Sequence, residues 1–311
     1  MFKKIVRKLQ QITNNIFNVA SSPCENANQN SRKEILIHIG FPKTGSTALQ
    51  FTLRKNFEYL KQNGVLFLDE GYELGGYLAK NSPLSEVNLL NLKNKWNSEV
   101  TNNNSQRIVL SSEGFYGSFY EPWLNSTDVA SDIDKIFEGN NLKIIAVLRS
   151  LPEAYESLYQ QYIKEGRSES FGKFKEMYDP LKYDYFEIKK PFIERFESSN
   201  IYLFNYSKMI TSGIGFTNNF FERLNIPVTF TKTETVYNPS LTKEGLELAR
   251  LVNPTLSDDK KNLFRNFLQQ AFPKQDREAI MLFERYEYNE LKAFYDCSIA
   301  KLKNAGCVFL N

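Results

Sequence analysis

The stretch EILIHIGFPKTGST, residues 34–47, decides the fold of this chain. Its first part, residues 34–40, is a short apolar run with several β-branched side chains, which is typical of a buried parallel strand. A loop follows, and behind it an apolar stripe with helical spacing begins, formed by Leu49, Leu53, Phe57 and Leu60. A strand that passes into a helix through such a loop predicts a βα unit, with the loop at the carboxyl end of a parallel sheet.

The loop itself is suited to an anion, because its backbone N–H groups converge and the new helix directs its positive end at the same point. Lys43 can add a mobile positive charge, and Ser46 and Thr47 can donate hydrogen bonds from their hydroxyls. Gly40 and Gly45 have the spacing of the ordinary loop GxxxxGKS/T, but a serine replaces its lysine, which here lies three residues earlier. The pattern therefore predicts an unusual phosphate-binding loop. The alternative is a tight βα turn without a ligand.

Outside this unit, the chain alternates between strand and helix patterns. Short apolar runs predict four more strands, at residues 65–68, 107–113, 143–150 and 201–207. Periodic patterns predict helices at residues 128–138, 151–165, 184–198 and 214–224. Alternation of this kind implies right-handed βαβ units and a central parallel sheet covered by helices on both faces. We therefore expect an α/β, P-loop-like fold with three layers.

The C-terminal part of the chain differs, because its patterns are mainly helical. Three segments have helical spacing, namely residues 242–252, 257–271 and 275–303. A chain of 311 residues is long enough for one large domain with additions. We expect a single α/β domain over residues 34–311, with a helical cap from about residue 240 to the end of the chain.

Residues 1–33 have a different character. Apolar residues recur at helical steps along one face, basic residues crowd the beginning, and a polar linker follows at residues 21–33. A basic amphipathic helix can lie on an anionic lipid surface or dock on a partner protein, here through residues 1–20. The alternative is a frayed leader that packs loosely on the domain. The segment lacks the continuous apolar core and the cleavage site of a secretory signal peptide.

The composition excludes several classes of protein. Apolar residues make up 41% and charged residues 24%, which excludes a wholly disordered chain. No run of about 18 apolar residues is present, so the sequence offers no candidate for a membrane-spanning helix. The formal net charge of +3 is too small to indicate a nucleic-acid partner. Three cysteines without disulfide or zinc spacing fit the cytoplasm, with the leader suited to the inner face of the membrane.

A second motif follows the apolar run KIIAVLRS, residues 143–150. Arg149 stands at the carboxyl end of this predicted strand, where open α/β sheets bind ligands, and Ser157 lies about two turns into the next helix. A magnesium-dependent NTPase would place an aspartate at such a strand end to hold the metal. An arginine there instead suggests a second phosphate that is bound directly, without a metal. The alternative is that Arg149 is only a surface charge.

Together the two motifs, PKTGSTALQ at residues 42–50 and RSLPEAYES at residues 149–157, resemble those of sulfotransferases that use 3′-phosphoadenosine 5′-phosphosulfate. The resemblance covers roughly residues 34–226 and is most similar to bacterial and Golgi-type carbohydrate sulfotransferases. It implies a carbohydrate hydroxyl as acceptor, 3′,5′-adenosine bisphosphate as the nucleotide product, and no required metal. By the same resemblance, the 5′-phosphosulfate is bound by Lys43, Thr44, Gly45, Ser46 and Thr47. Arg149 and Ser157 bind the 3′-phosphate.

The resemblance has two departures, which bear on the catalytic base. Cytosolic members of the family use a histidine in a loop where this chain has none, and a glycine-rich segment near the C-terminus is missing. Both favour the carbohydrate-acting branch, whose members often use a carboxylate. Glu113 follows the predicted strand 107–113 at the edge expected for Lys43 and Arg149, so we expect Glu113 to accept the proton and Lys43 to stabilise the leaving oxygen. The alternative base is His38, the single histidine, which lies inside the first strand and is otherwise structural.

Two other functions stay open at this point. The chain can be a P-loop kinase or NTPase with a displaced lysine. Against this, the predicted strand 143–150 ends in Arg149 and not in the aspartate that would hold magnesium. It can also be a nucleotide-binding scaffold without catalysis, although Lys43 and Glu113 speak against that. A transferase of sulfuryl groups is the favoured hypothesis.

Overall fold

The computed structural model describes residues 32–41, 43–117, 125–210, 215–231, 240–273 and 281–310. The predicted leader, residues 1–20, and nearly all of the linker behind it lie outside the described residues, so the membrane or partner contact stays a prediction. Within the part of the chain that the structure describes, no helix combines the length and the apolar character needed to cross a membrane.

The described residues form one sheet of six parallel strands in the order β2-β3-β1-β4-β5-β6. The strands are β1 (Glu34–Ile39), β2 (Val65–Phe67), β3 (Arg107–Ser112), β4 (Asn141–Leu148), β5 (Ile201–Asn205) and β6 (Val308–Leu310). The first strand lies in the middle, between β3 and β4. The chain leaves β1 toward one edge of the sheet and later continues from β4 toward the other, which creates the switch point where such sheets bind ligands.

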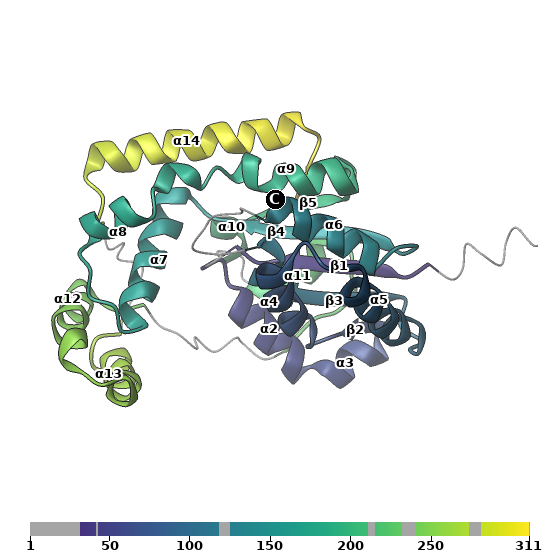
Figure 1. Ribbon diagram of the computed structural model, residues 1–311, viewed down its shortest axis with the longest axis horizontal. Helices are drawn as coiled ribbons and strands as arrows, with labels where there is room; N and C mark the ends of the chain where they lie inside the picture. Colours follow the sequence, from purple (N-terminus) through teal and green to yellow (C-terminus); the bar gives the residue numbers. More distant parts are fainter. Residues whose placement is uncertain are drawn as a thin grey trace, which may run out of the picture.

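Helices cover both faces of this sheet, which confirms the expected three-layer α/β fold. Those that contribute to the smaller apolar cluster are α2 (Ser46–Lys55), α3 (Phe57–Gln62), α10 (Tyr206–Ile210) and α11 (Phe216–Arg223). The larger cluster includes α4 (Gly71–Asn81), α5 (Glu86–Thr101), α6 (Ser126–Ile136), α7 (Leu151–Lys164), α8 (Phe171–Met177), α9 (Tyr185–Phe196), α12 (Lys243–Val252), α13 (Asp258–Ala271) and α14 (Arg285–Asn304). Figure 1 shows α7, α8, α12 and α13 gathered beyond one end of the sheet and α14 running across the top of the view.

The period of the strands explains the two clusters. Successive side chains of β1 point to opposite faces, so Ile35 and Ile37 join the larger cluster while Leu36 joins the smaller one. All three are essentially fully buried. A strand buried on both faces has the near-continuous apolar sequence that residues 34–39 show.

The structure corrects the expected elements at three places. The C-terminal region is not only a helical cap, because β6 pairs with β5 and extends the sheet at its edge. The strand expected at residues 143–150 ends at Leu148, so Arg149 lies just beyond it. The third place is the helix expected at residues 275–303, because residues 281–284 are not helical and α14 begins at Arg285. The structure also has a helix that the sequence patterns do not predict, α4, whose glycines are required by close packing. A Cβ on Gly114 of the turn after β3 would lie 2.4 Å from the backbone of Gly75 in α4.

Candidate functional site

The loop after β1 makes a sharp turn at Gly45, as a glycine suggests, and also at Lys43, which the sequence does not suggest. Lys43 and Gly45 both have positive φ angles, 66° and 87°, which reverse the chain between the strand and α2. The hydroxyl of Thr44 donates a hydrogen bond of 2.5 Å to the carbonyl of Phe41, so this buried side chain holds the loop together. Gly45 occupies the N-cap position, and because it has no side chain it leaves the first N–H groups of α2 uncapped. That arrangement is the one that a bound anion completes.

Gly45 also has a packing role on its other side. A Cβ at this position would lie 3.0 Å from the ring of Phe216, the first residue of α11, and it would also strain the positive φ angle. The loop is therefore clamped between α11 and the sheet. Thr47, one residue into α2 from the buried Ser46, is exposed.

Arg149, from the second motif, docks directly on this loop. Its Nη1 donates a hydrogen bond of 3.2 Å to the carbonyl of Lys43, and its guanidinium lies over the ring of Tyr206 at 5.1 Å from the centroid. Its Nε lies 3.5 Å from the carboxylate of Glu153, one turn into α7. The hydroxyl of Tyr185 donates a hydrogen bond of 2.9 Å to the Arg149 carbonyl. Residues 106 positions apart in the sequence thus meet at the carboxyl edge of β1 and β4.

Ser150 and Glu153, at the start of α7, have the residue types and spacing of a capping box, but no capping box forms. Ser150 is the N-cap residue of α7 but makes no capping hydrogen bond with its side chain. The physical reason is that the Glu153 carboxylate faces Arg149 instead of the N-cap backbone. The helix begins all the same, because Pro152 is favourable in its first turn.

Lys43 lies in a crowded electrostatic environment. Its Nζ donates a hydrogen bond of 3.5 Å to Oε1 of Gln161. Burial lowers the pKa of Lys43, and the neighbouring guanidinium of Arg149 lowers it further, whereas the carboxylates of Glu113 and Glu165 act in the opposite direction. Two cations held this close favour an anion between them, because it would relieve their repulsion. The residues of the two motifs therefore form a site that suits a phosphate-bearing ligand.

Ser157 lies on the face of α7 that points at this region. Residues four apart share one face of a helix, and Glu153, Ser157 and Gln161 have that spacing. The first of them contacts Arg149 and the last contacts Lys43. The Ser157 side chain, which is 7% exposed, is therefore placed between two contacts with the proposed phosphate-binding cations.

Glu113 begins the short 3-10 turn Glu113–Tyr116 directly after β3 and lies beside the loop. Its Cγ would be 3.3 Å from a Cβ on Gly40, and that same Cβ would lie 2.4 Å from Oγ of Ser46. Glycine at position 40 therefore allows the carboxylate and the start of α2 to approach each other. Burial raises the pKa of Glu113, while its own backbone N–H, Ser46, Lys43 and Gln50 act to lower it.

Ser46 is the buried first residue of α2. Its Oγ is buried and makes no hydrogen bond of ordinary length and angle within the described residues, although it is near enough to Glu113 to favour the ionised carboxylate. We interpret this hydroxyl as one whose best partner is still missing. A bound oxyanion at the loop is such a partner.

His38 lies inside the sheet and is completely buried. Its Nδ1 is 2.8 Å from Oγ of Ser111, and the edge of its ring packs on Phe220 at a centroid distance of 5.7 Å. Burial, assisted by the charge of Lys189, lowers the pKa of His38 to about 3. The imidazole is therefore neutral at physiological pH and closed to an acceptor, which favours Glu113 over His38 as the base.

Several residues of the site were not found by sequence reasoning. Gln161 and Tyr206 contact Lys43 and Arg149, and Phe216 packs on Gly45. Only Gln161 had a usable signal, because it stands one turn beyond Ser157 on the same helix. Lys164, the last residue of α7, is also buried, and burial together with Lys43 and Arg265 lowers its pKa to about 7.

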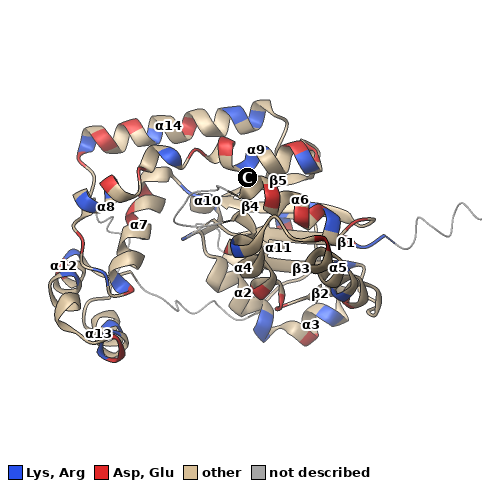
Figure 2. Cartoon of the chain, viewed as in Figure 1, with Lys and Arg blue, Asp and Glu red and all other residues tan. Residues whose placement is uncertain are grey.

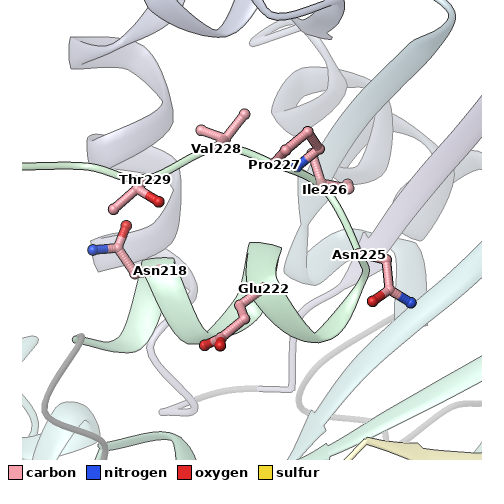
Figure 3. Close-up of a pocket in the computed structure, with 7 residues that line it drawn as sticks. All are labelled: Asn218, Glu222, Asn225, Ile226, Pro227, Val228 and Thr229. Atoms are coloured by element: carbon pink, nitrogen blue, oxygen red, sulfur yellow. The ribbon is translucent and has the colours of Figure 1, made fainter.

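The charge distribution, the hollow on the surface and the acidic and metal-binding side chains complete the picture of the site's surroundings. Positive and negative side chains are interspersed over the helices, so the charge at the loop is a local feature (Figure 2). A hollow of about 480 Å³ lies elsewhere, between α11 and residues 225–229, with Asn218 and Glu222 in its wall (Figure 3). It contains none of the predicted site residues. Among the described residues, no group of three or more histidine, cysteine or acidic side chains gathers in an arrangement that could hold a metal.

Eight chains of solved structures match this chain. The chain is similar to the crystal structure of a sulfotransferase from Alicyclobacillus acidocaldarius, with 13% sequence identity and a TM-score of 0.44. The alignment covers 88% of this chain and 95% of that one. No protein-family model matches the sequence, and no curated protein matches it. A likeness this distant supports no argument about activity, so the proposal below rests on the site.

Proposed function

We propose that this protein is a sulfotransferase that moves the sulfuryl group of 3′-phosphoadenosine 5′-phosphosulfate to a hydroxyl of a carbohydrate. The single observation that supports this most is the hydrogen bond between Arg149 and the carbonyl of Lys43. It joins an anion-binding loop to a second cation at the switch point of the sheet. An adenosine nucleotide with phosphates at both its 5′ and 3′ positions is a ligand that two such cations side by side would bind.

The loop and Arg149 bind and orient the nucleotide in this proposal. The uncapped N-terminus of α2 and the hydroxyls of Ser46 and Thr47 hold the 5′-phosphosulfate, while Arg149 and Ser157 hold the 3′-phosphate. The nucleotide supplies an activated sulfuryl group whose departure leaves a negative charge on the 5′-phosphate oxygen. Lys43 lies where it can stabilise that charge, and because burial and Arg149 lower its pKa, an added anion would favour its ammonium form.

Glu113 is the proposed base. One S–O bond forms to the acceptor oxygen as the other breaks, and the acceptor hydroxyl loses its proton, which the carboxylate accepts. Burial raises the pKa of Glu113 and so makes it a stronger base than an exposed glutamate, while Lys43 and Gln50 act to lower that pKa. These opposing effects are what a base working near neutral pH requires.

The other parts of the proposal concern where the enzyme works. We propose a glycan acceptor, no required metal, and a cytoplasmic location in which residues 1–20 attach the enzyme to a membrane surface or a partner. The balanced charge on the described helices supports a partner recognised at the site rather than a polyanion held over a whole face (Figure 2).

The test is a turnover assay with the purified protein, 3′-phosphoadenosine 5′-phosphosulfate and a panel of carbohydrates. We expect formation of 3′,5′-adenosine bisphosphate that depends on an acceptor, together with a sulfated product identified by mass spectrometry. A parallel assay measures hydrolysis of ATP with magnesium. ATP hydrolysis without use of the sulfuryl donor would establish the kinase or NTPase alternative. Binding of the bisphosphate without any transfer would establish a scaffold.

A further inference from the structure

The side chain of Lys43 is held at its tip by the helix that follows the second cation of the site. Its Nζ donates a hydrogen bond of 3.5 Å to Oε1 of Gln161, which lies on α7, 118 positions further along the chain. The carbonyl of the same lysine accepts a hydrogen bond of 3.2 Å from Arg149, just before α7. Lys43 is therefore held both at its backbone and at its ammonium group.

The amide of Gln161 has a partner at each end, and this decides which end faces Lys43. Its Nε2 donates a hydrogen bond of 3.0 Å to Oε1 of Glu165, which follows four residues later on the same face of the helix. Because an ionised carboxylate only accepts hydrogen bonds, the amide must turn its N–H₂ end to Glu165. Its carbonyl end then faces the ammonium group, which only donates.

Charges of both signs surround the Lys43 ammonium. The charge of Arg149 lowers the pKa of Lys43, whereas those of Glu113 and Glu165 raise it. Lys43 in turn lowers the pKa of Lys164, the last residue of α7, so these two cations repel each other. Attraction and repulsion between charges have no preferred direction, whereas a hydrogen bond is directional. The contact with the amide is therefore what sets the direction in which Nζ points.

We propose that Gln161 is a positioning residue for Lys43, that Glu165 orients Gln161, and that together they direct the ammonium group at the oxygen that leaves with the 5′-phosphate. The inference rests on the proposed function for its catalytic meaning, whereas the chain from Glu165 to Lys43 is structural. Neither Gln161 nor Glu165 belongs to the two phosphate-binding motifs, and the proposed function gives them no role.

The primary experiment observes the Lys43 ammonium directly, by NMR titration of protein labelled with ¹³C at the lysine Cε. The signal is assigned by its absence in Lys43→Met. Gln161→Met removes the acceptor while keeping the length of the side chain. A hydrogen bond to the charged form favours that form, so we expect the pKa of Lys43 to fall by about half a unit. We also expect kcat to fall about tenfold, while the affinity for 3′,5′-adenosine bisphosphate changes by less than about twofold.

Two substitutions at the exposed Glu165 separate orientation from charge. Glu165→Gln keeps an oxygen that accepts the Gln161 N–H, and the lost charge is screened by solvent, so kcat should stay within about twofold of the wild type. Glu165→Leu frees the amide to turn, and kcat should fall about threefold. In a protein that already carries Gln161→Met, Glu165→Leu should have no further effect, because the two residues act in series. Additive losses would overturn the orienting role of Glu165.

The matched control is Gln160→Met. Gln160 is the neighbouring glutamine on α7, it is buried, and its Oε1 has no hydrogen-bond partner in the described part of the chain. We expect this variant to leave both the pKa of Lys43 and kcat unchanged. A change equal to that of Gln161→Met would show a general disturbance of α7 and overturn the specific role of Gln161.

The remaining outcomes separate this inference from the proposed function. An unchanged Lys43 pKa in folded Gln161→Met protein would overturn the positioning role, whether or not the enzyme transfers sulfuryl groups. An unchanged kcat in a protein that does transfer them would overturn it as well. A lowered Lys43 pKa in a protein that transfers none would support the contact and contradict the proposed reaction.

Discussion

Two lysines in two regions of the molecule, one half-buried and one fully buried, show what distinguishes a site from a core. Lys43, at the carboxyl edge of the sheet, has Gln161, Arg149 and Glu113 around it. Lys189, on α9, is fully buried, has no hydrogen-bond partner for its Nζ among the described residues, and lies 3.8 Å from the centroid of the Tyr116 ring. Burial lowers the pKa of both, but only the first is surrounded by polar groups from several elements.

The difference teaches that burial of a charge is not by itself a sign of function. The layer around Lys189 is aromatic, and its rings support the site from beneath. Tyr185 packs on Phe41 of the loop at 4.7 Å, and its hydroxyl bonds to the Arg149 carbonyl. A charge in such a layer costs stability, whereas a charge at the edge can be compensated by a ligand.

The largest effect is expected at the edge, for Glu113→Gln. The change keeps the shape of the side chain and removes its basicity, so turnover should fall by about 10²–10⁴-fold while nucleotide affinity stays near that of the wild type. Steady-state kinetics and calorimetric titration with 3′,5′-adenosine bisphosphate measure the two quantities. His38→Asn should retain most of the activity. The reverse pattern would transfer the role of base to His38.

Identical substitutions at the two lysines compare the regions directly. Lys43→Met should lower kcat by about 10²–10³-fold, because it removes a charge that stabilises the leaving oxygen in the transition state. Lys189→Met should leave kcat within about twofold, because Lys189 contacts rings and not the site. Single-turnover measurements on both variants decide the matter. Equal losses would mean that the aromatic layer belongs to the catalytic machinery.

His38 gives a pH dependence of stability, whose sign follows from its pKa. The folded pKa of about 3 lies below the unfolded value of about 6.5, so between these pH values the unfolded chain binds a proton at His38 and the folded protein does not. Stability is therefore lost as the pH falls below about 6.5, and the loss between pH 7 and pH 5 should be about 2 kcal/mol. Urea unfolding at both pH values, compared with His38→Asn, measures it. An equal loss in the variant would contradict the assignment.

The smallest effect concerns the stability of the aromatic layer. Burial lowers the pKa of Lys189 in the folded protein, so the unfolded chain binds this proton more tightly than the folded protein does. The buried lysine therefore lowers the free energy of unfolding at neutral pH. Lys189→Met removes the loss, and we expect the free energy of unfolding at pH 7 to rise by about 1 kcal/mol, since the Tyr116 ring compensates part of the cost. Denaturant midpoints measure the change. A fall in stability would show that Lys189 has a partner that matters.

The strands and the two motifs could be predicted from the sequence because their signals are local. The apolar runs of β1 and β4, each followed by residues that suit a helix start, are enough to place Lys43 and Arg149 at one edge. The edge strand β6 could not be predicted, because three half-buried residues have no periodicity to detect. In α4, the glycines needed for close packing obscure the helical signal.

Within the site, the types of residue were predictable but their environments were not. Nothing in a strand sequence tells whether His38 faces solvent or Phe220, and that contact depends on a helix almost two hundred residues away. The same holds for Gln50, whose amide reaches a neighbouring strand. Such contacts arise from tertiary packing, which no local pattern records.

The central claim is that Arg149 selects a nucleotide with a phosphate at the 3′ position, and calorimetry tests it most directly. The affinities for 3′,5′-adenosine bisphosphate and AMP are measured in the wild type and in Arg149→Met. We expect the bisphosphate to bind the wild type about 10- to 100-fold more tightly, as one charge-assisted contact of about 1.5–3 kcal/mol would give. That preference should disappear in the variant. Equal affinities in the wild type, or a preference that survives in Arg149→Met, would contradict the account.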